Sequence, residues 1–268
     1  MKFTPHTVKL PSGDVKYYVG GEGRPLLYWH TGGGVRFSPG LVELAKTFKI
    51  YAPVMPGFDG TPQLPGIKDC KDLGKLGSEF LDTVVKDPHC DVMGHSIGGL
   101  VAAWTAVLSP DKIGQLVLVG PAGFRSPDLP ASPPPADPKE RAKQAYAHPE
   151  KIMPDPRSPE VAKKEVDVTM GYMAGRAYDA EVIGRLGELE CLTMVLVGTA
   201  EKSVPPEAVW LLRNAIKRCH SIYVYDAAHI VDIDQPERFA AVVGDFLTRA
   251  DSFIVHPGNP STATGAVA

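Results

Sequence analysis

The feature that most constrains this chain is the regular alternation of short apolar runs with longer segments of helical periodicity. Six such runs are LLYWH, IYAPVMP, CDVMGHS, QLVLVG, TMVLVG and SIYVYD, and most of them are separated by a stretch long enough for a helix. Strands that alternate with helices form a largely parallel sheet covered by helices. The continuous apolar character of the runs agrees, because parallel strands are usually buried on both faces. The sequence therefore predicts an α/β domain.

Two further strands are expected before these six. FTPHTVKL and DVKYYVG are joined by Pro11-Ser12-Gly13, whose composition is typical of a turn, so they predict an antiparallel hairpin at the sheet edge. Apolar residues at three- and four-residue spacing predict helices in SPGLVELAKTF, DLGKLGSEFLDTVV, PPEAVWLLRNAIKR and QPERFAAVVGDFLTRA. The expected fold is a mostly parallel eight-stranded sheet with helices on both faces.

The alternation breaks after QLVLVG. Prolines are dense from Pro121 to Pro156, and helical patterns follow in SPEVAKKEVDVTMGYMAGRA and YDAEVIGRLGEL before the strand TMVLVG. Because the strand pattern then resumes, residues 121–190 are predicted to be a small helical cap, held by stiff linkers and inserted after the sixth strand of a core formed by residues 1–120 and 191–250. Residues 251–268 contain few apolar side chains, and we expect a flexible tail.

Composition limits the possible partners. The chain has 268 residues, of which 44% are hydrophobic and 22% charged, as in an ordinary globular protein with a sizeable core. Its formal net charge of -3, without a long run of Lys or Arg, does not suggest binding to nucleic acid or an anionic membrane. No apolar segment typical of a signal peptide or of a membrane span is visible. We therefore expect a cytoplasmic protein that acts on a small molecule.

No metal or organic cofactor is expected. The cysteines form no CxxC pair, so they suggest neither a zinc site nor a disulfide framework, and we interpret them as buried reduced thiols. Motifs of the H-E-x-x-H type, a Walker lysine motif and a clear dinucleotide glycine fingerprint are missing as well. The four cysteines are Cys70, Cys90, Cys191 and Cys219.

The segment DVMGHSIGGLVAAW places a serine at the junction of a strand and a helix. A G-x-S-x-G motif alone is weak, because glycine and serine are common in turns. Here, however, Gly94 and Gly98 permit a tight turn that presents the hydroxyl of Ser96 above the sheet. The N-terminus of the following helix adds partial positive charge where an oxyanion would form. Ser96 is therefore the predicted nucleophile.

A serine hydroxyl needs a nearby base, usually a histidine that a carboxylate orients. His229 follows the last strand, in YVYDAAHIVDIDQPE, and Glu201 follows the preceding strand, in VLVGTAEKSVPPEA. Both should project from the same edge of the sheet as Ser96. Their order along the chain, serine then acid then histidine, is that of the nucleophile-elbow hydrolases.

With these residues the chain resembles the α/β-hydrolase superfamily, from about the N-terminal hairpin to the last helix. Members commonly have a His-Gly segment after the third strand, and here HTGGG follows LLYW. The resemblance implies an oxyanion hole formed by a backbone N–H near Gly32 or Gly33 together with that of Ile97. Thr31 stands where the family usually has glycine, which leaves open which of the two glycines contributes.

The acid also departs from the family pattern. The family usually has aspartate three residues after the strand-ending glycine and four before the proline, and at this spacing from Gly198 and Pro205 the chain has Glu201. Glutamate is longer by one methylene, so the loop or the imidazole must shift slightly. Asp128, after the sixth strand, is the alternative acid, since some relatives take theirs from there. The aspartates that flank His229 are expected to cap helices or to face solvent: Asp226, Asp232 and Asp234.

In this superfamily the insertion after the sixth strand forms a lid over the active site. Methionine and aromatic side chains in the lid suit apolar, adaptable substrates, although a lid needs the same residues simply to pack. The candidate substrate-binding residues are Tyr172 and Met173 in the lid, and His30 and His95 beside the catalytic loops.

The predicted function is that of a serine hydrolase that cleaves a carboxylic ester of a small to medium, partly apolar substrate through an acyl-enzyme. Two alternatives stay open: a carbon-carbon bond hydrolase of diketone-type ring-cleavage products, with the same three residues, and a ligand receptor with slow or no turnover. Dehalogenase and epoxide hydrolase chemistry is disfavoured, because those relatives use aspartate at the position of Ser96.

Overall fold

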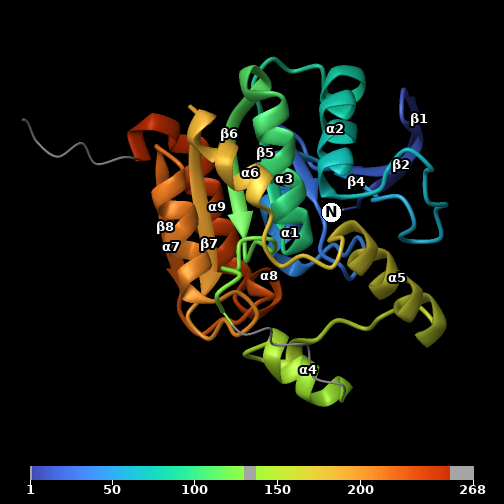
Figure 1. Cartoon of the computed structure of the whole chain (residues 1–268), viewed down its shortest axis with the longest axis vertical. Helices are drawn as coiled ribbons and strands as arrows, with labels where there is room; N and C mark the ends of the chain where they lie inside the picture. Colours follow the sequence, from blue (N-terminus) through green and yellow to red (C-terminus); the bar gives the residue numbers. More distant parts are fainter. Residues whose placement is uncertain (1, 130–136, 254–268) are drawn as a thin grey trace, which may run out of the picture.

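The computed structural model describes residues 2–129 and 137–253, and one eight-stranded sheet runs through its centre in the order β1-β2-β4-β3-β5-β6-β7-β8 (Figure 1). The two N-terminal strands form an antiparallel hairpin that pairs with β4, and the other six are parallel. The predicted mostly parallel α/β fold is therefore confirmed. The strands are β1 (Thr4–Leu10), β2 (Gly13–Gly20), β3 (Arg24–Trp29), β4 (Phe48–Pro53), β5 (Cys90–His95), β6 (Ile113–Val119), β7 (Leu192–Gly198) and β8 (Cys219–Val224).

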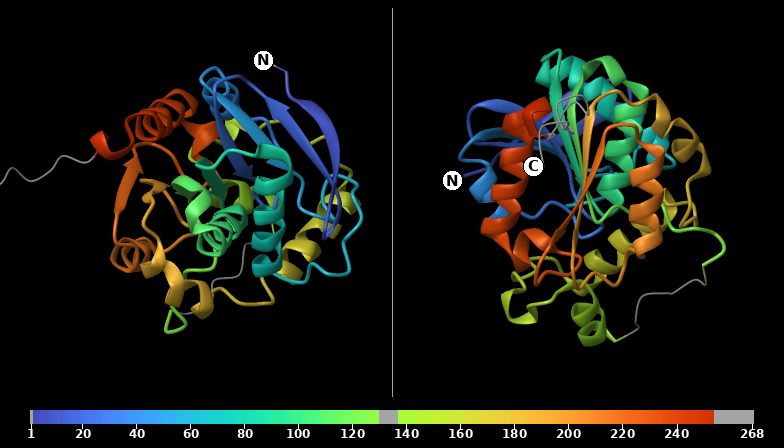
Figure 2. Two further views of the ribbon diagram at one scale, coloured as in Figure 1. Left: turned by 90° about the horizontal axis from the view of Figure 1, so that it is seen from above. Right: turned by 90° about the vertical axis from the view of Figure 1, so that its left-hand side faces the viewer.

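Helices cover both faces of the sheet (Figure 2). One layer contains α1 (Pro39–Leu44), α8 (Val231–Asp234) and α9 (Pro236–Arg249), which contact one another. The other contains α2 (Cys70–Phe80), α3 (Ile97–Leu108), α6 (Ala180–Arg185) and α7 (Pro206–Ala215). Sequence signals explain where several of them begin: the Ser38 hydroxyl caps α1, the Asp69 carboxylate caps α2, and α1, α7 and α9 each start at a proline.

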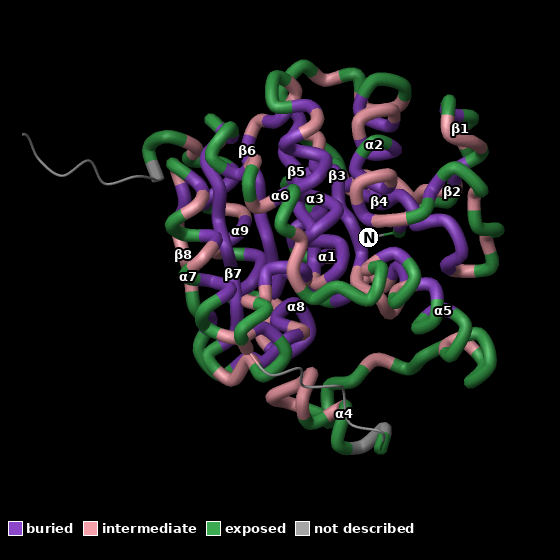
Figure 3. The backbone as a smooth tube through the Cα atoms, in the orientation of Figure 1, coloured by how far each residue is buried: buried purple, intermediate pink, exposed green. Residues whose placement is uncertain are grey.

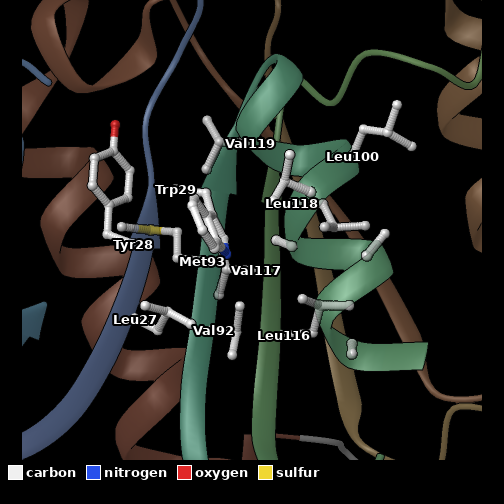
Figure 4. Packing of buried hydrophobic residues seen from close by; sticks show 14 of the residues in the cluster. Leu27, Tyr28, Trp29, Val92, Met93, Leu100, Leu116, Val117, Leu118 and Val119 are labelled. Carbon is white, nitrogen blue, oxygen red and sulfur yellow. The ribbon is translucent and has the colours of Figure 1, made fainter. Parts of the chain in front are cut away.

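The central strands form the core because apolar side chains project from both faces of the sheet. Every residue of β5 and of β7 is buried, and the backbone trace shows this burial running through the middle of the molecule (Figure 3). Side chains of β3, β5 and β6 belong, together with Leu100 of α3, to one buried hydrophobic cluster (Figure 4). Full burial of one such aliphatic side chain contributes about 1.5–3 kcal/mol.

The insertion between β6 and β7 contains α4 (Pro138–Ala145), a 3-10 turn η3 (Pro149–Lys151), α5 (Pro159–Tyr172), α6 and a second 3-10 turn η4 (Leu186–Glu188). α4 and α5 lie beyond the carboxyl ends of the strands (Figure 1). α6 instead packs against α3 and α7, with Val182 fully buried, and Asp179 accepts a hydrogen bond from the Trp104 indole at 2.8 Å. Within the predicted cap of residues 121–190, the segment from Asp179 to the end of α6 thus packs against the helical layer that contains α3 and α7.

Two sequence expectations fall partly outside the described residues. Part of the predicted stiff linker, residues 130–136, is not described. The same holds for most of the predicted tail, although residues 251–253 complete a short 3-10 helix, η5 (Ala250–Phe253). No helix within the described ranges is long and apolar enough to cross a bilayer.

The glycines around Ser96 allow a close contact between α3 and β3. A Cβ on Gly98 would lie 2.2 Å from the Trp29 carbonyl oxygen and 2.5 Å from that of His30, and neither backbone atom can move easily. A Cβ on Gly171, on the outside of α5, would meet nothing within 4 Å.

We expect Gly98→Ala to lower the free energy of unfolding by at least about 1–3 kcal/mol, because overpacking forces backbone shifts. The control Gly171→Ala should raise it by about 0.5–1 kcal/mol, since alanine favours a helix. Urea unfolding measures both. A Gly98→Ala midpoint equal to that of the wild type would contradict the close contact.

Candidate active site

Ser96 lies on a strained turn between β5 and α3. Its backbone has φ 59° and ψ −120°, a region that residues with a side chain rarely adopt. Three backbone hydrogen bonds hold this conformation: the Ser96 N–H donates to Val119 O at 2.9 Å, and Ser96 O accepts from the N–H groups of Gly99 (2.9 Å) and Ala122 (3.0 Å). A Cβ on Gly94 would meet Gly98 O at 1.9 Å, so the turn also needs that glycine. This is the geometry expected of a nucleophile elbow.

Parallel pairing brings the other predicted residues to the same edge of the sheet. His95, the last residue of β5, is level with Val119 of β6, and Gly198 of β7 is level with Val224 of β8. The loops after β7 and β8, which carry Glu201 and His229, therefore begin close to Ser96. The predicted location of the site at the carboxyl ends of the strands follows from this register.

His229 and Glu201 form a buried pair. His229 Nδ1 lies 2.8 Å from Glu201 Oε2, and their side chains are 11% and 6% exposed. The other oxygen, Oε1, accepts from the N–H groups of Ser203 (2.6 Å) and Val204 (3.2 Å). The longer glutamate is thus accommodated by a turn that binds one oxygen and presents the other to the imidazole. A carboxylate only accepts, so Nδ1 carries the proton and Nε2 is the basic nitrogen.

The environment of Glu201 favours its ionised form. Burial by itself would raise the pKa of the carboxyl group. The hydrogen bond with His229, the electrostatic interaction with its ring and the two backbone N–H groups outweigh burial, and they hold the pKa of Glu201 below its ordinary value. An ionised Glu201 can stabilise the positive charge that His229 acquires when it takes a proton.

The structure does not bring Asp128, the alternative acid, to His229. Its side chain is exposed, and its hydrogen bonds are with Ser126, whose hydroxyl lies 3.5 Å from Asp128 Oδ2. The geometry therefore favours Glu201 as the acid.

Of the two candidate oxyanion-hole glycines, the geometry favours Gly32. The Gly33 N–H donates to the Thr31 hydroxyl at 3.1 Å. No acceptor for the Gly32 N–H is found among the residues that the structure describes, and the Ile97 N–H, at the start of α3, has no partner within its helix. The unusual threonine at position 31 thus occupies one N–H and leaves the other for a ligand.

The loop that carries these glycines is supported by the cap. Asp59 Oδ2 accepts from the Val35 N–H at 3.1 Å, and the Asp59 N–H donates to Glu165 Oε1 at 2.9 Å. Glu165 lies on α5, is 1% exposed and forms an ion pair with Arg157. A buried carboxylate of the cap therefore supports the oxyanion loop through Asp59.

Two of the four predicted substrate-binding residues have structural contacts instead. His30 is fully buried: its Nδ1 lies 2.6 Å from Thr31 O, and its Nε2 accepts from the Met55 N–H at 3.0 Å. Tyr172 is 2% exposed and donates its hydroxyl proton to Pro56 O at 2.7 Å. With their polar atoms engaged and almost no free surface, these two side chains fix loops and do not reach a substrate.

Two cavities meet at the proposed nucleophile, and Ser96 and His229 line both. The first, which we call the apolar lobe, has a volume of about 470 Å³ and is lined mainly by Pro121, Phe124, Met170, Met173, Val204 and Ala208. The second, the polar lobe, has a volume of about 420 Å³, and its walls include Tyr28, Gly32, Arg36, His95, Tyr146 and Asp232. Met173 and His95, the other two predicted substrate-binding residues, thus each face a cavity.

The aspartates near His229 correct the sequence analysis. Asp226 is exposed, as expected, but Asp234 is fully buried and Asp232 is 5% exposed. Asp234 accepts from the N–H groups of Ala228 (2.8 Å), Ala147 (3.0 Å) and His148 (3.0 Å). The expectation of helix capping or solvent exposure was wrong for Asp232 and Asp234, because α8 turns both side chains inward.

Asp234 therefore joins the loop before His229 to the cap segment after α4. Neither this contact nor the polar-lobe position of Asp232 and Arg36 was anticipated. The one signal in the sequence was the group of three aspartates in YDAAHIVDID, close to the predicted base His229.

The cysteines are free thiols, three of them buried and Cys191 partly exposed. Within residues 2–129 and 137–253, no group of three His, Cys, Asp or Glu side chains is arranged to hold a metal ion.

An eight-stranded α/β sheet with a serine elbow and a carboxylate-oriented histidine at its carboxyl edge defines a hydrolase of the nucleophile-elbow class. The chain belongs to the alpha/beta hydrolase family, whose model matches residues 26–242. This confirms the resemblance drawn from the motifs.

Known proteins of this family resemble the chain over most of its length. The 2-hydroxy-6-oxo-6-(2'-aminophenyl)hexa-2,4-dienoic acid hydrolase of Metapseudomonas resinovorans is 24% identical over 260 residues, which cover 88% of each chain. Among solved structures, a serine hydrolase involved in carbazole degradation has a TM-score of 0.76 at 21% identity, over 92% of this chain and 99% of that one. Naproxen esterase from Bacillus subtilis has a TM-score of 0.71 at 15% identity, over 91% of each chain. The two structural likenesses show the shared fold.

We expect Glu201→Gln to lower kcat for an ester by a factor on the order of 10³ to 10⁴, because an amide holds the imidazole without stabilising its positive charge. Asp128→Asn should leave kcat within about twofold of the wild type, because the exposed Asp128 does not reach His229. Steady-state hydrolysis of a p-nitrophenyl ester measures both. A silent Glu201→Gln with an inactive Asp128→Asn would reassign the acid.

Proposed function

We propose that the protein is a serine hydrolase that cleaves the carboxylic ester of a small to medium, partly apolar substrate through an acyl-enzyme. The observation that carries this proposal is the left-handed turn of Ser96 at the meeting point of two cavities that His229 also lines. His229 is oriented there by Glu201. A cytoplasmic location, expected from the sequence, remains part of the proposal.

In the first half of the proposed reaction, Ser96 Oγ attacks the ester carbonyl while His229 Nε2 accepts the hydroxyl proton. The carbonyl oxygen becomes an oxyanion, which the N–H groups of Gly32 and Ile97 stabilise. Glu201 stabilises the imidazolium. The bond to the alcohol oxygen then breaks, and His229 returns the proton to the leaving alcohol.

In the second half, His229 accepts a proton from water, and the resulting hydroxide oxygen attacks the acyl carbonyl. The same two N–H groups stabilise the second oxyanion. Its collapse breaks the bond to Ser96 Oγ, which recovers its proton from His229, and releases the carboxylic acid. The chain's own residues supply every proton transfer in this scheme.

The two lobes suggest how the substrate is divided. Because both cavities include Ser96 and His229, groups on opposite sides of the scissile bond can occupy separate lobes. The methionines Met170 and Met173 suit an apolar group of variable shape. The polar lobe, which is similar in size at about 420 Å³, carries charged side chains in a wall that is otherwise largely apolar, so it suits a group with a polar substituent.

The second candidate function is hydrolysis of a carbon-carbon bond in a diketone-type ring-cleavage product. The observation that favours it is the likeness to the dienoic acid hydrolase of Metapseudomonas resinovorans along 88% of the chain. The same serine, histidine and acid would serve this reaction. A third possibility, a ligand receptor on the same fold, differs in its slow or absent turnover.

We expect Ser96→Ala to lower kcat for p-nitrophenyl esters by a factor on the order of 10⁴ to 10⁶, as in other serine triads. Steady-state rates with acyl chains of increasing length, measured beside the variant, check this and size the acyl site. Circular dichroism shows whether the variant keeps its fold.

Other outcomes separate the candidates. Unchanged rates in a pure Ser96→Ala sample would contradict the nucleophile. If folded wild-type protein hydrolyses no ester but cleaves a 2-hydroxy-6-oxo-dienoic acid, the carbon-carbon candidate replaces the ester one. A single stoichiometric burst without turnover favours the receptor.

A further inference from the structure

Asp232 is a buried carboxylate in the wall of the polar lobe, and its Oδ1 atom lacks a hydrogen-bond partner. The residue is 5% exposed, it lines the cavity, and its Oδ1 atom accepts no hydrogen bond in the structure. Buried carboxylates are normally paired or hydrogen-bonded, because the loss of water costs several kcal/mol. By contrast, Asp234, two residues away, accepts hydrogen bonds from three backbone N–H groups. The unpaired oxygen is enclosed and faces His95, whereas Asp232 as a residue lines the cavity, so the cavity wall presents a carboxylate with unused hydrogen-bonding capacity to a ligand.

The side chain next to Asp232 does not supply the missing proton. His95 Nε2 lies 2.8 Å from His229 O, and a carbonyl oxygen only accepts, so Nε2 carries the ring proton. In neutral His95, Nδ1 is then an acceptor, and it faces Asp232 Oδ1 at 3.6 Å. Burial lowers the pKa of His95, and the nearby charge of Asp232 only partly opposes this. Two acceptors therefore face each other with no donor between them.

Two arginines that line the polar lobe, Arg36 and Arg157, are engaged with other carboxylates. Arg36 pairs with Asp155 at 3.1 Å, and Arg157 pairs with Asp155 at 2.6 Å and with Glu165. Their guanidinium groups also make the lobe unfavourable for a ligand cation. A neutral donor, such as a hydroxyl group, can satisfy the carboxylate without facing a like charge.

We propose that the polar lobe binds a hydroxyl group of the substrate, which donates a hydrogen bond to the Asp232 carboxylate. Asp232 is then a specificity residue, and the preferred substrates are hydroxylated esters whose apolar part occupies the apolar lobe. This inference rests on the proposed function, because it places the hydroxyl group relative to an ester bond at Ser96.

The test compares esters that differ only by a hydroxyl in place of a methyl group. Ethyl 6-hydroxyhexanoate with ethyl heptanoate tests the acyl side, and 3-hydroxypropyl butanoate with butyl butanoate tests the alcohol side. The first readout is the ratio of kcat/KM within each pair. The second is the ratio of Kd values for the same pairs on Ser96→Ala protein, measured by titration calorimetry, which does not require turnover.

For one of the two pairs we expect the wild type to prefer the hydroxylated ester by about 10- to 100-fold, the range of a hydrogen bond to a charged group. In Asp232→Asn the preference should fall to within about threefold of unity, because a hydrogen bond to the neutral amide oxygen is weaker than one to a carboxylate. Asp128→Asn, a change at an exposed carboxylate outside both lobes, should keep the full preference. If the Asp232→Asn variant does not fold, Asp232→Ala replaces it, and the same loss of preference is expected.

A wild-type preference near unity for both pairs in both readouts would overturn the inference, and so would a preference that survives in Asp232→Asn and Asp232→Ala. If no ester is turned over but the Kd ratio behaves as expected, the proposed function fails and the hydroxyl site stands. If esters are turned over without a preference, the function stands and the hydroxyl site fails.

Discussion

The left-handed backbone of Ser96 is the constraint on which the rest of the site depends. A residue with a side chain adopts φ 59° only when its surroundings impose it. Here the parallel pairing of β5 with β6 supplies the Val119 carbonyl that binds the Ser96 N–H, and Gly94 and Gly98 let α3 start directly above the sheet. The same arrangement places the N-terminus of α3, with the Ile97 N–H, beside the hydroxyl. The proposed nucleophile and the proposed oxyanion site are thus produced by one packing arrangement.

Two buried carboxylates connect the predicted cap to the loops of the candidate site. Glu165 of α5 binds the Asp59 N–H and thereby supports the oxyanion loop, while Asp234 of α8 binds the N–H groups of Ala147 and His148 in the cap. Since each carboxylate is almost fully buried, breaking either contact would remove hydrogen bonds from a buried charge that water cannot easily reach. Displacement of the cap would therefore disturb both the oxyanion loop and the histidine loop.

The sequence was sufficient for the strands, the fold and the grouping of Ser96, Glu201 and His229, because apolar periodicity and position after a strand determine which residues reach one edge of a parallel sheet. It was not sufficient for side-chain direction. The side chains of His30 and Tyr172 form hydrogen bonds with the backbone, and Asp232 lines a cavity. Packing between segments that are distant in the chain determines these directions. The short polar helix α4 carries no apolar stripe, and α6 joins the core through contacts that no local pattern encodes.

The central claim is that Ser96 is an activated nucleophile, and the most direct measurement is the site of reaction with a fluorophosphonate. The hydroxyl oxygen attacks phosphorus, fluoride leaves, and the serine keeps a stable phosphonate ester. Peptide mass spectrometry of protein treated with one equivalent should locate the added mass on Ser96, and heat-unfolded protein treated in the same way should not react. The account would be contradicted if the folded protein stays unmodified, or if the added mass lies on another residue while Ser96 remains free.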